Sequence, residues 1–346
     1  MLNQLNLIDL FLVPIYFSFI LLIVKLLSNK KQSNINGNKW LIRGVLLKIT
    51  GGLVFCLVYI YAYYGGDSWA YFMGAKALGE LFLVDFDSAW AIFTNQITGY
   101  EANSLFSHDT GYPPTYMLRD HHTFTVCRLS SIFYLLGAKS FIITTLLTSS
   151  FSFIGIWKFY KLVTTLYKGH EKAFFLTIIC MPSLLFWGGG IMKDTFVLSS
   201  TCWVSYNFFM VFIYRKKVLI NVLFLAINIL IIVNIKSYII LSLLPGMLLW
   251  LNSAYIKNIK NKFIKILSIP FIGIIIFSIG FFAFSNLNQL MGKYSDVDAA
   301  INQARIIQQD LLREEAYGSN SYYLGEIDGT IGGMLRLAPA AIFTAI

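Results

Sequence analysis

The sequence predicts an all-α fold, a polytopic bundle of transmembrane helices, from its composition and from the length of its apolar runs. Of the 346 residues, 57% are hydrophobic and only 13% are charged, about half of the roughly 25% charge that soluble domains carry. Apolar residues also recur in runs of about 18 or more, the length that a helix needs to cross a bilayer. The same composition excludes a disordered chain, a collagen-like chain and a small disulfide-stapled domain.

Eight apolar segments are expected to span the membrane. They cover residues 7–27, 42–63, 140–163, 173–190, 195–214, 218–235, 237–254 and 266–284. The shorter segment 123–137 is interrupted by Arg128 and predicts an interfacial or re-entrant helix. We expect residues 1–346 to form a single multi-span membrane domain. Because an apolar run begins near residue 336, we also expect the sequence to be the N-terminal part of a longer protein.

The distribution of charge predicts the orientation of these spans. One set of connecting loops carries 17 of the 27 basic residues and one acidic residue, Glu171, whereas the other set carries 10 basic and 16 acidic residues. The positive-inside rule places the first set in the cytoplasm. The N-terminus and the two long loops, about 64–139 and 285–336, are therefore expected on the extracytoplasmic face. The net charge of +10 then reflects membrane topology, and no nucleic-acid partner is expected.

Residue types that bind metal ions are present, but their spacing matches no common metal site. The four cysteines lack a C-x-x-C pair and read as small core residues; they are Cys56, Cys127, Cys180 and Cys202. His121 and His122 are adjacent and point apart, so no structural zinc site is predicted. Asp85 and Asp87 point the same way only in an extended segment, and a solvated loop is favoured over a metal pair. The sequence does not identify a cofactor. A loosely bound divalent cation near residues 108–122 stays an alternative.

The segment 65–78 (GGDSWAYFMGAKAL) places a carboxylate just beyond the second predicted span. Two glycines allow a sharp turn, and Asp67 occupies the position expected of a helix N-cap. A helical pattern follows, with Tyr71 on the same face as Ala75 and Leu78. One interpretation is a capped helix after a tight turn. The other is a general base at the membrane boundary, which accepts a proton from the hydroxyl group of an acceptor.

The segment 181–194 (MPSLLFWGGGIMKD) combines helix breakers with two charged residues. Pro182 predicts a kink and glycines 188–190 predict a break near the outer interface. Broken backbone at membrane depth is tolerated only against protein or a wet cavity. Lys193 and Asp194 follow at the mouth of the next span. They indicate either a helix–helix turn with a snorkelling lysine, or a site in which Lys193 binds the phosphate of a lipid carrier while Asp194 orients it.

Further basic residues are expected on the same outer face. Lys236 follows an apolar run in the sequence NIKSY and reads either as an interface anchor or as a second phosphate contact. Arg119, in the sequence RDHH, or Arg128 would complete the cavity. Cations in that place suit an anionic headgroup, because they neutralise the charge that develops on a leaving phosphate.

The segments 65–78 and 181–194 resemble GT-C glycosyltransferases, polytopic membrane enzymes that transfer sugars from polyprenyl-phosphate donors on the extracytoplasmic face. The early aspartate past an apolar span, followed by an aromatic-rich helix with Ala-Lys-Ala-Leu, resembles their first outer loop. Asp67 matches the position of their catalytic aspartate. The second segment is similar to the P-S-x-x-F-W…G-x-x-K-[DE] stretch of bacterial members. No single aspartate of this chain aligns with the second acidic motif that many members carry.

The resemblance implies an inverting glycosyltransferase of a bacterial cytoplasmic membrane. Its expected partners are the lipid bilayer, a polyprenyl-linked sugar donor, and a glycan, lipid or protein acceptor. The expected base is Asp67, and the expected substrate-binding residues are Lys193, Asp194, Lys236, Arg119 and Tyr71. Two alternatives stay open. One is a polymerase of the O-antigen or exopolysaccharide type, which would use arginines of its outer loops, and the other is a secondary transporter, although no inverted repeat is evident.

Cysteine labelling tests the predicted topology. In a variant without native cysteines, a membrane-impermeant thiol reagent applied from outside should label Tyr100→Cys and Asn320→Cys. It should miss Asn34→Cys and Lys260→Cys, because the basic loops are expected in the cytoplasm. Permeabilised cells, in which all four positions are accessible, provide the control. Labelling of residues 34 and 260 in intact cells would reverse the orientation.

Overall fold

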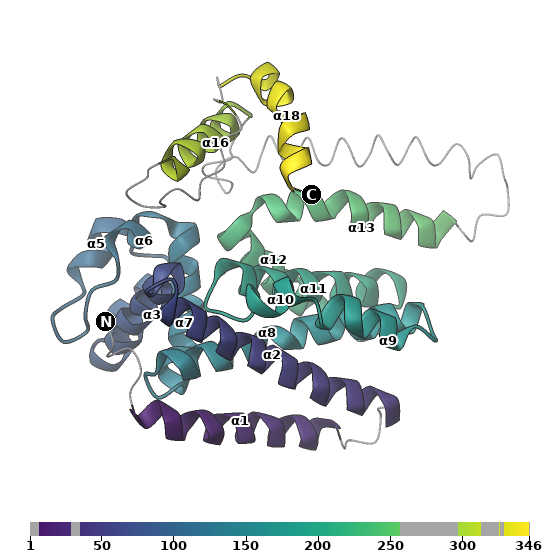
Figure 1. Cartoon of the computed structure of the whole chain (residues 1–346), viewed down its shortest axis with the longest axis horizontal. Coiled ribbons are helices and arrows are strands. Elements are labelled where there is room, and N and C mark those ends of the chain that lie inside the picture. Colours follow the sequence, from purple (N-terminus) through teal and green to yellow (C-terminus); the bar gives the residue numbers. More distant parts are fainter. Residues whose placement is uncertain (1–6, 29–34, 257–296, 313–324, 326–328, 346) are drawn as a thin grey trace. The chain divides into compact units, whose positions relative to one another are not determined.

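The computed structural model describes residues 7–28, 35–256, 297–312, 325 and 329–345, and every regular element in these ranges is helical (Figure 1). The all-α prediction is confirmed for this part of the chain. The chain divides into two compact units, residues 1–236 and 237–346. Each unit is described by itself, and the first contains all six residues predicted to form a site.

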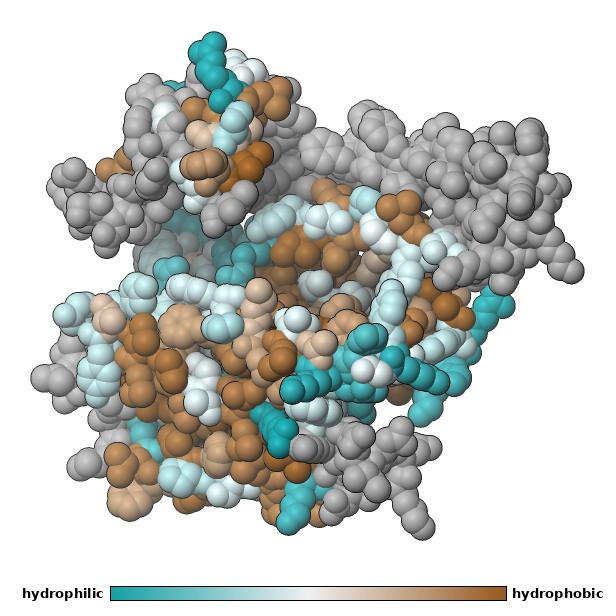
Figure 2. Space-filling model, turned by 45° about the vertical axis from the view of Figure 1, so that its right-hand side comes forward, coloured by the Kyte–Doolittle hydropathy of each residue, from teal (hydrophilic) through white to brown (hydrophobic). Residues whose placement is uncertain are grey.

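Five helices of the first unit are long and apolar enough to cross a membrane, which supports the prediction of a multi-pass membrane protein. They are α1 (Leu7–Ser28), α2 (Ile35–Tyr61), α8 (Phe141–Leu166), α11 (Lys193–Phe208, continued by a π-helical turn over Phe209–Ile213) and α12 (Val218–Lys236). Large apolar side chains of α1 and α12 remain exposed, such as Phe11 and Leu219. Figure 2 shows hydrophobic residues over a broad area of the visible face, as expected where lipid is the solvent.

The predicted span 173–190 is not one continuous helix. It consists of α9 (Glu171–Phe174), a π-helical turn (Phe175–Ile179), a break at Cys180 and the short helix α10 (Pro182–Phe186). Pro182 has no amide hydrogen to donate, so it begins a new helix instead of continuing the old one.

The remaining two predicted spans fall in the second unit. Segment 237–254 corresponds to α13 (Tyr238–Ile256), whose apolar part is shorter than the five helices above, and segment 266–284 lies outside the described residues. In the predicted loop 285–336, helix α16 covers Val297–Leu311. A further helix, α18, covers Ile331–Ala345.

The long loop expected at residues 64–139 is itself folded into helices. These are α3 (Gly66–Val84), α4 (Phe86–Phe93), α5 (Gly99–Ser104), α6 (Thr115–Arg119) and α7 (His121–Leu136). Helix α7 contains the predicted segment 123–137 and packs along α3. Glycines allow this close approach, because a Cβ atom at Gly74 would lie 2.5 Å from Cys127 Sγ and one at Gly79 would lie 2.5 Å from the Tyr134 ring.

The break before α11 is held by α2. A Cβ atom on Gly52 would lie 3.0 Å from the Gly189 carbonyl oxygen, and one on Gly190 would collide with the Phe55 ring, so the two backbones are in direct contact. Lys48, which is 1% exposed, donates its Nζ hydrogens to the carbonyl oxygens of Leu184 at 3.1 Å and Gly188 at 2.5 Å. Lys48 is one of the 17 basic residues assigned above to the cytoplasmic side, where it was expected to flank the second span. It lies instead inside the span Trp40–Tyr61 and satisfies carbonyl groups that the break leaves without helical partners.

The two ends of the spanning helices differ in composition. At one end, Lys158 Nζ lies 5.3 Å from the centre of the Trp203 ring and 5.0 Å from that of Tyr206. The positive charges of Lys161 and Lys217 lie near enough to repel it. At the other end, the first turn of α11 meets the last turn of α12. The expected clustering of basic residues at one end is therefore compatible with the helix arrangement of the first unit.

Replacement of Lys48 by methionine should destabilise the protein. Lys48→Met retains most of the side-chain volume but leaves buried carbonyl groups without a donor, which costs about 1–3 kcal/mol. We expect a lower thermal unfolding midpoint in detergent, measured by circular dichroism. Lys76→Met, at an exposed position of α3, should leave the midpoint nearly unchanged. Equal midpoints for the two variants would show that the Lys48 contacts contribute nothing to stability.

Candidate functional site

Most of the predicted site residues lie at one end of the first unit, where helices distant in sequence meet. Asp194 in the first turn of α11 and Lys236 at the last position of α12 form an ion pair, with Nζ 2.5 Å from Oδ1. The sequence predicted both residues but assigned Asp194 the role of orienting Lys193. The structure instead pairs Asp194 with a lysine 42 positions further along the chain.

Lys193 is held by the start of α7. Its Nζ donates to Thr123 Oγ1 at 2.7 Å and lies 3.9 Å from Asp120 Oδ2. Asp120 is the N-cap of α7, where it accepts hydrogen bonds from the His122 amide at 3.2 Å and from Thr123 Oγ1 at 2.6 Å. One carboxylate thus both starts a helix and orients the lysine of another helix.

Asp67 lies in the first turn of α3 and is exposed. The predicted N-cap role is wrong, because the capping residue is Gly65, with φ of +106°, and no side chain caps this helix. In the described part of the chain, no hydrogen bond or ion pair reaches the Asp67 carboxylate. Its negative charge acts electrostatically on the hydroxyl groups of Tyr59, Tyr71 and Tyr116.

Tyr71, Ala75 and Leu78 are all buried on α3, as the helical spacing predicted. Burial and then the negative charge of Asp67 raise the pKa of Tyr71 far above its usual range. The charge of Asp120 also acts on the Tyr71 hydroxyl group. In the same way, the charges of Asp67 and Asp194 both act on the Tyr59 hydroxyl group. Each of the two tyrosine hydroxyl groups is therefore within electrostatic range of Asp67 and of an aspartate that pairs with a lysine.

Arg119 and Arg128 have different environments. Arg119 is exposed at the end of α6, with its guanidinium 5.3 Å from the centre of the Tyr100 ring. Arg128, in the middle of α7, is 6% exposed and stacks on Phe124 at 5.1 Å. The sequence offered them as alternatives for one cavity. The structure places Arg128, and not Arg119, in the wall of a cavity of about 340 Å³.

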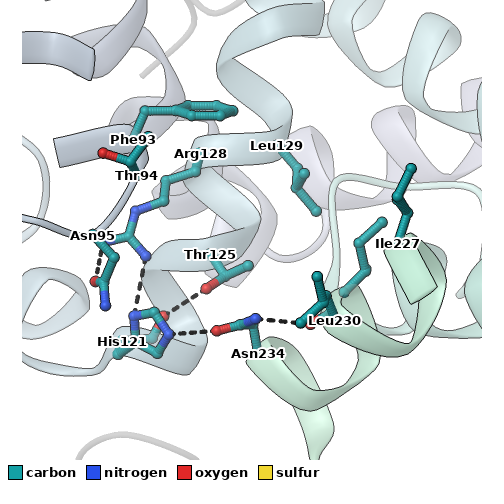
Figure 3. A pocket seen from close by; sticks show the side chains of 11 residues that line it. Phe93, Thr94, Asn95, His121, Thr125, Arg128, Leu129, Ile227, Leu230 and Asn234 are labelled. Atoms are coloured by element: carbon teal, nitrogen blue, oxygen red, sulfur yellow. Dashed lines mark hydrogen bonds between the residues drawn. The ribbon is translucent and has the colours of Figure 1, made fainter. Parts of the chain in front are cut away.

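The cavity at Arg128 has one polar side and one apolar side (Figure 3). Asn95 and His121 contact the guanidinium, and Asn234 of α12 contacts His121. Apolar residues of α12 form the opposite side. The full lining is Phe93, Thr94, Asn95, His121, Thr125, Arg128, Leu129, Ile227, Leu230, Ile231 and Asn234. A lone arginine in an otherwise apolar run was the only sequence signal for this cavity.

A directed chain of hydrogen bonds crosses the cavity wall. Because an arginine is always a donor, Arg128 Nη1 donates to His121 Nδ1 at 3.1 Å. His121 Nε2 must then carry the proton and donate to Asn234 Oδ1 at 2.8 Å. Asn234 Nδ2 in turn donates to the Leu230 carbonyl at 2.8 Å (Figure 3). This chain fixes the neutral tautomer of His121 and ties α7 to α12.

Burial shifts the two titratable groups of this chain. It lowers the pKa of Arg128 to about 10, so the guanidinium stays charged at neutral pH. Burial also lowers the pKa of His121, and the Asn234 hydrogen bond only partly offsets this shift. A proton on Nδ1 of His121 would face Arg128, so the folded chain favours the neutral imidazole.

Other polar groups of the first unit have structural partners. Asp85 ends α3 and caps α4 by accepting hydrogen bonds from the Ser88 amide and hydroxyl, at 3.1 and 2.6 Å. A second cavity, of about 420 Å³, contains Glu80, whose carboxylate is bound by Tyr134 and Lys139; none of the six predicted residues lines it. Within the described ranges, no three histidine, cysteine, aspartate or glutamate side chains gather as metal ligands would.

Comparison with known proteins adds no relative to this description. No family model matches the chain, and no curated protein or solved structure is detectably similar to it. The resemblance to GT-C enzymes therefore depends on the two sequence segments alone.

The lowered pKa of His121 predicts a pH-dependent stability. Since the folded pKa lies below the unfolded value of about 6.5, the stability from neutral His121 is present above pH 6.5 and is lost as the pH falls through the folded pKa. The stability advantage of the wild type over His121→Gln should shrink between pH 7.5 and pH 5, measured by thermal unfolding in detergent. His108→Gln, at an exposed position, should follow the wild type at both pH values. A constant wild-type advantage would contradict the prediction.

Proposed function

We propose that this protein is a membrane glycosyltransferase that moves a sugar from a polyprenyl-phosphate donor to an acceptor hydroxyl on the extracytoplasmic face. The observation that carries the proposal is that Asp67, which has no ion pair in the described ranges, lies near Tyr59 and Tyr71, whose hydroxyl groups are also near the aspartates that pair with Lys236 and Lys193. A proton acceptor beside cations is what the transfer of a group away from a phosphate requires.

The reaction is a direct displacement at the anomeric carbon. The acceptor oxygen forms a bond to that carbon while the bond from the carbon to the phosphate oxygen breaks, and the phosphate leaves with the electron pair. Asp67 takes the proton of the acceptor hydroxyl, and the ammonium groups of Lys193 and Lys236 donate hydrogen bonds to the leaving phosphate. A single displacement inverts the configuration at the anomeric carbon.

The partners of the three aspartates favour Asp67 as the base. The Asp120 carboxylate caps α7 and contacts Thr123, and the Asp194 carboxylate contacts Lys236. These hydrogen bonds stabilise the ionised form and occupy the oxygen atoms that would accept a proton. Asp67 is exposed and carries no such contact in the described ranges. The raised pKa of Tyr71 keeps its hydroxyl group protonated, so in this proposal Tyr71 acts as a hydrogen-bond donor.

A glycan polymerase is the second candidate, and the buried Arg128 is the observation that favours it. Such a protein would use the same displacement on a lipid-linked donor but would use an arginine of its outer region to bind the substrate. Arg128 belongs to the segment 64–139, which is expected on the extracytoplasmic face, and it lines a cavity near the ion pairs. The two candidates differ in the acceptor, which a polymerase would take as a growing glycan.

Replacement of Asp67 by asparagine tests the assignment of the base. Asp67→Asn keeps the size and polarity of the side chain, but an amide does not accept the proton, so the transfer rate should fall by about 10²–10⁴-fold. The measurement is transfer of a radiolabelled sugar by membranes that contain equal amounts of protein. Asp87→Asn, which changes another exposed first-turn aspartate, should transfer at the wild-type rate. Full activity of a folded Asp67→Asn protein would remove Asp67 from the mechanism.

A further inference from the structure

Arg128 is a buried cation for which the described ranges provide no acidic partner. Its guanidinium donates to the Ile92 carbonyl at 2.9 Å, to Asn95 Oδ1 at 2.7 Å and to His121 Nδ1 at 3.1 Å. All three acceptors are neutral. No carboxylate appears among the charges that act on it. A buried charge without a counter-ion is costly, so this position favours the binding of an anion.

The two lysines of the neighbouring site do not share this property. Lys236 lies 2.5 Å from Asp194, and Lys193 lies 3.9 Å from Asp120. Their charges are already balanced, whereas the charge of Arg128 is not. An anion that enters this end of the first unit therefore gains most by contact with Arg128.

The guanidinium also retains unused donors. Arginine has five N–H groups, and the three hydrogen bonds to Ile92, Asn95 and His121 use one each. One N–H on each of Nη1 and Nη2 remains available on a group that lines the cavity. Two N–H groups of one guanidinium match two oxygens of a phosphate.

The opposite wall of the cavity is apolar. Ile227, Leu230 and Ile231 of α12 form it, and Leu230 is 60% exposed on a helix that is long and apolar enough to span a membrane. A hydrocarbon chain that lies against these residues is in contact with both the cavity and the surrounding lipid. Figure 3 shows the apolar side chains of α12 across from the polar group around Arg128.

The polar and apolar parts follow each other along the helix axis. Asn234, which belongs to the polar wall, is two residues from the end of the span Val218–Lys236, and Ile227 is about two turns deeper. A phospholipid or phosphate-linked isoprenoid presents its groups in the same order, with the phosphate at the boundary and the chain inward.

We infer that the cavity at Arg128 binds the phosphate of a single-chain amphiphile, with the phosphate against the guanidinium and the hydrocarbon chain along α12. The identification of this ligand with the lipid carrier of a sugar rests on the proposed function. The binding itself does not, because it requires only the cavity. Asn234 is two residues before Lys236 and His121 directly follows Asp120, so the bound phosphate lies near the proposed transfer site.

Binding of farnesyl phosphate to the full-length protein in detergent tests the inference without any transfer reaction. The Kd for farnesyl phosphate, measured by native mass spectrometry or calorimetry, should rise at least tenfold in Arg128→Gln. Arg43→Gln is the matched control, since it removes an exposed arginine of α2 that has no part in the proposed site and should bind as the wild type does. Farnesol and inorganic phosphate, each tested alone, should bind far more weakly than farnesyl phosphate.

A second variant protects the test against misfolding. If Arg128→Gln loses its helical circular dichroism, Leu230→Gln replaces it, because Leu230 takes part in the hydrogen-bonded chain only through its backbone carbonyl, which this substitution retains. This variant should weaken farnesyl phosphate binding by making the wall polar.

Four outcomes would overturn the inference. Equal affinity for farnesol would show that the guanidinium binds no phosphate, and equal affinity for inorganic phosphate would show that the chain does not contribute. Unchanged binding in folded Arg128→Gln would exclude this residue, and unchanged binding in Leu230→Gln would exclude the α12 wall. Asp67→Asn separates this inference from the proposed function. Loss of transfer with intact farnesyl phosphate binding in this variant supports both, whereas full transfer with intact binding contradicts the proposed base and leaves the binding inference standing.

Discussion

The arrangement of the first unit depends on how a broken helix satisfies its backbone inside a largely apolar protein. Between α9 and α11 the chain cannot continue as a helix, because Pro182 and glycines 188–190 interrupt it. In lipid, carbonyl groups released by such a break have no water to bind. The ammonium of Lys48 supplies the missing donors, and the glycines let α2 come close enough to deliver them. Since α11 begins directly after this break, the same contact sets the positions of Lys193 and Asp194.

Charge balance distinguishes the groups at the site more clearly than their identity does. Lysines and aspartates at this end of the first unit are matched in pairs, which lowers the cost of placing them near the membrane. Asp67 and Arg128 are two charges for which the described residues show no ion pair. One is exposed and negative, and the other is buried and positive. A proton acceptor and an anion site are the roles that these environments favour, and the polar groups between them, Tyr71 and His121, remain neutral near pH 7.

Local sequence patterns predicted what depends on composition and spacing. Apolar runs located the five long helices, and spacing along α3 predicted the face on which Tyr71, Ala75 and Leu78 are buried. The predictions that were wrong concern features that depend on contacts between distant segments. Residues 173–190 are apolar enough for a span, but hydropathy does not register the backbone hydrogen bonds that Pro182 removes.

Local sequence patterns also could not predict which groups pair with individual charges. The contact between Asp194 and Lys236 joins residues 42 positions apart, and Lys48 reaches carbonyls about 140 positions away. Lys48 resembled an ordinary flanking residue because its partners are main-chain atoms, which no side-chain pattern reveals. The N-cap prediction for Asp67 failed for a related reason, since Gly65 adopts a positive φ and starts the helix two residues earlier.

The exposure of Leu230 and its neighbours on α12 has a consequence for how a ligand reaches the cavity at Arg128. A cavity with one wall on a lipid-facing helix is approached sideways, by diffusion within the plane of the bilayer, and not from the aqueous phase. Its occupancy then follows the mole fraction of the amphiphile among the surrounding lipids. Dilution of the membrane with inert lipid would empty such a cavity, whereas dilution of the whole suspension with buffer would not.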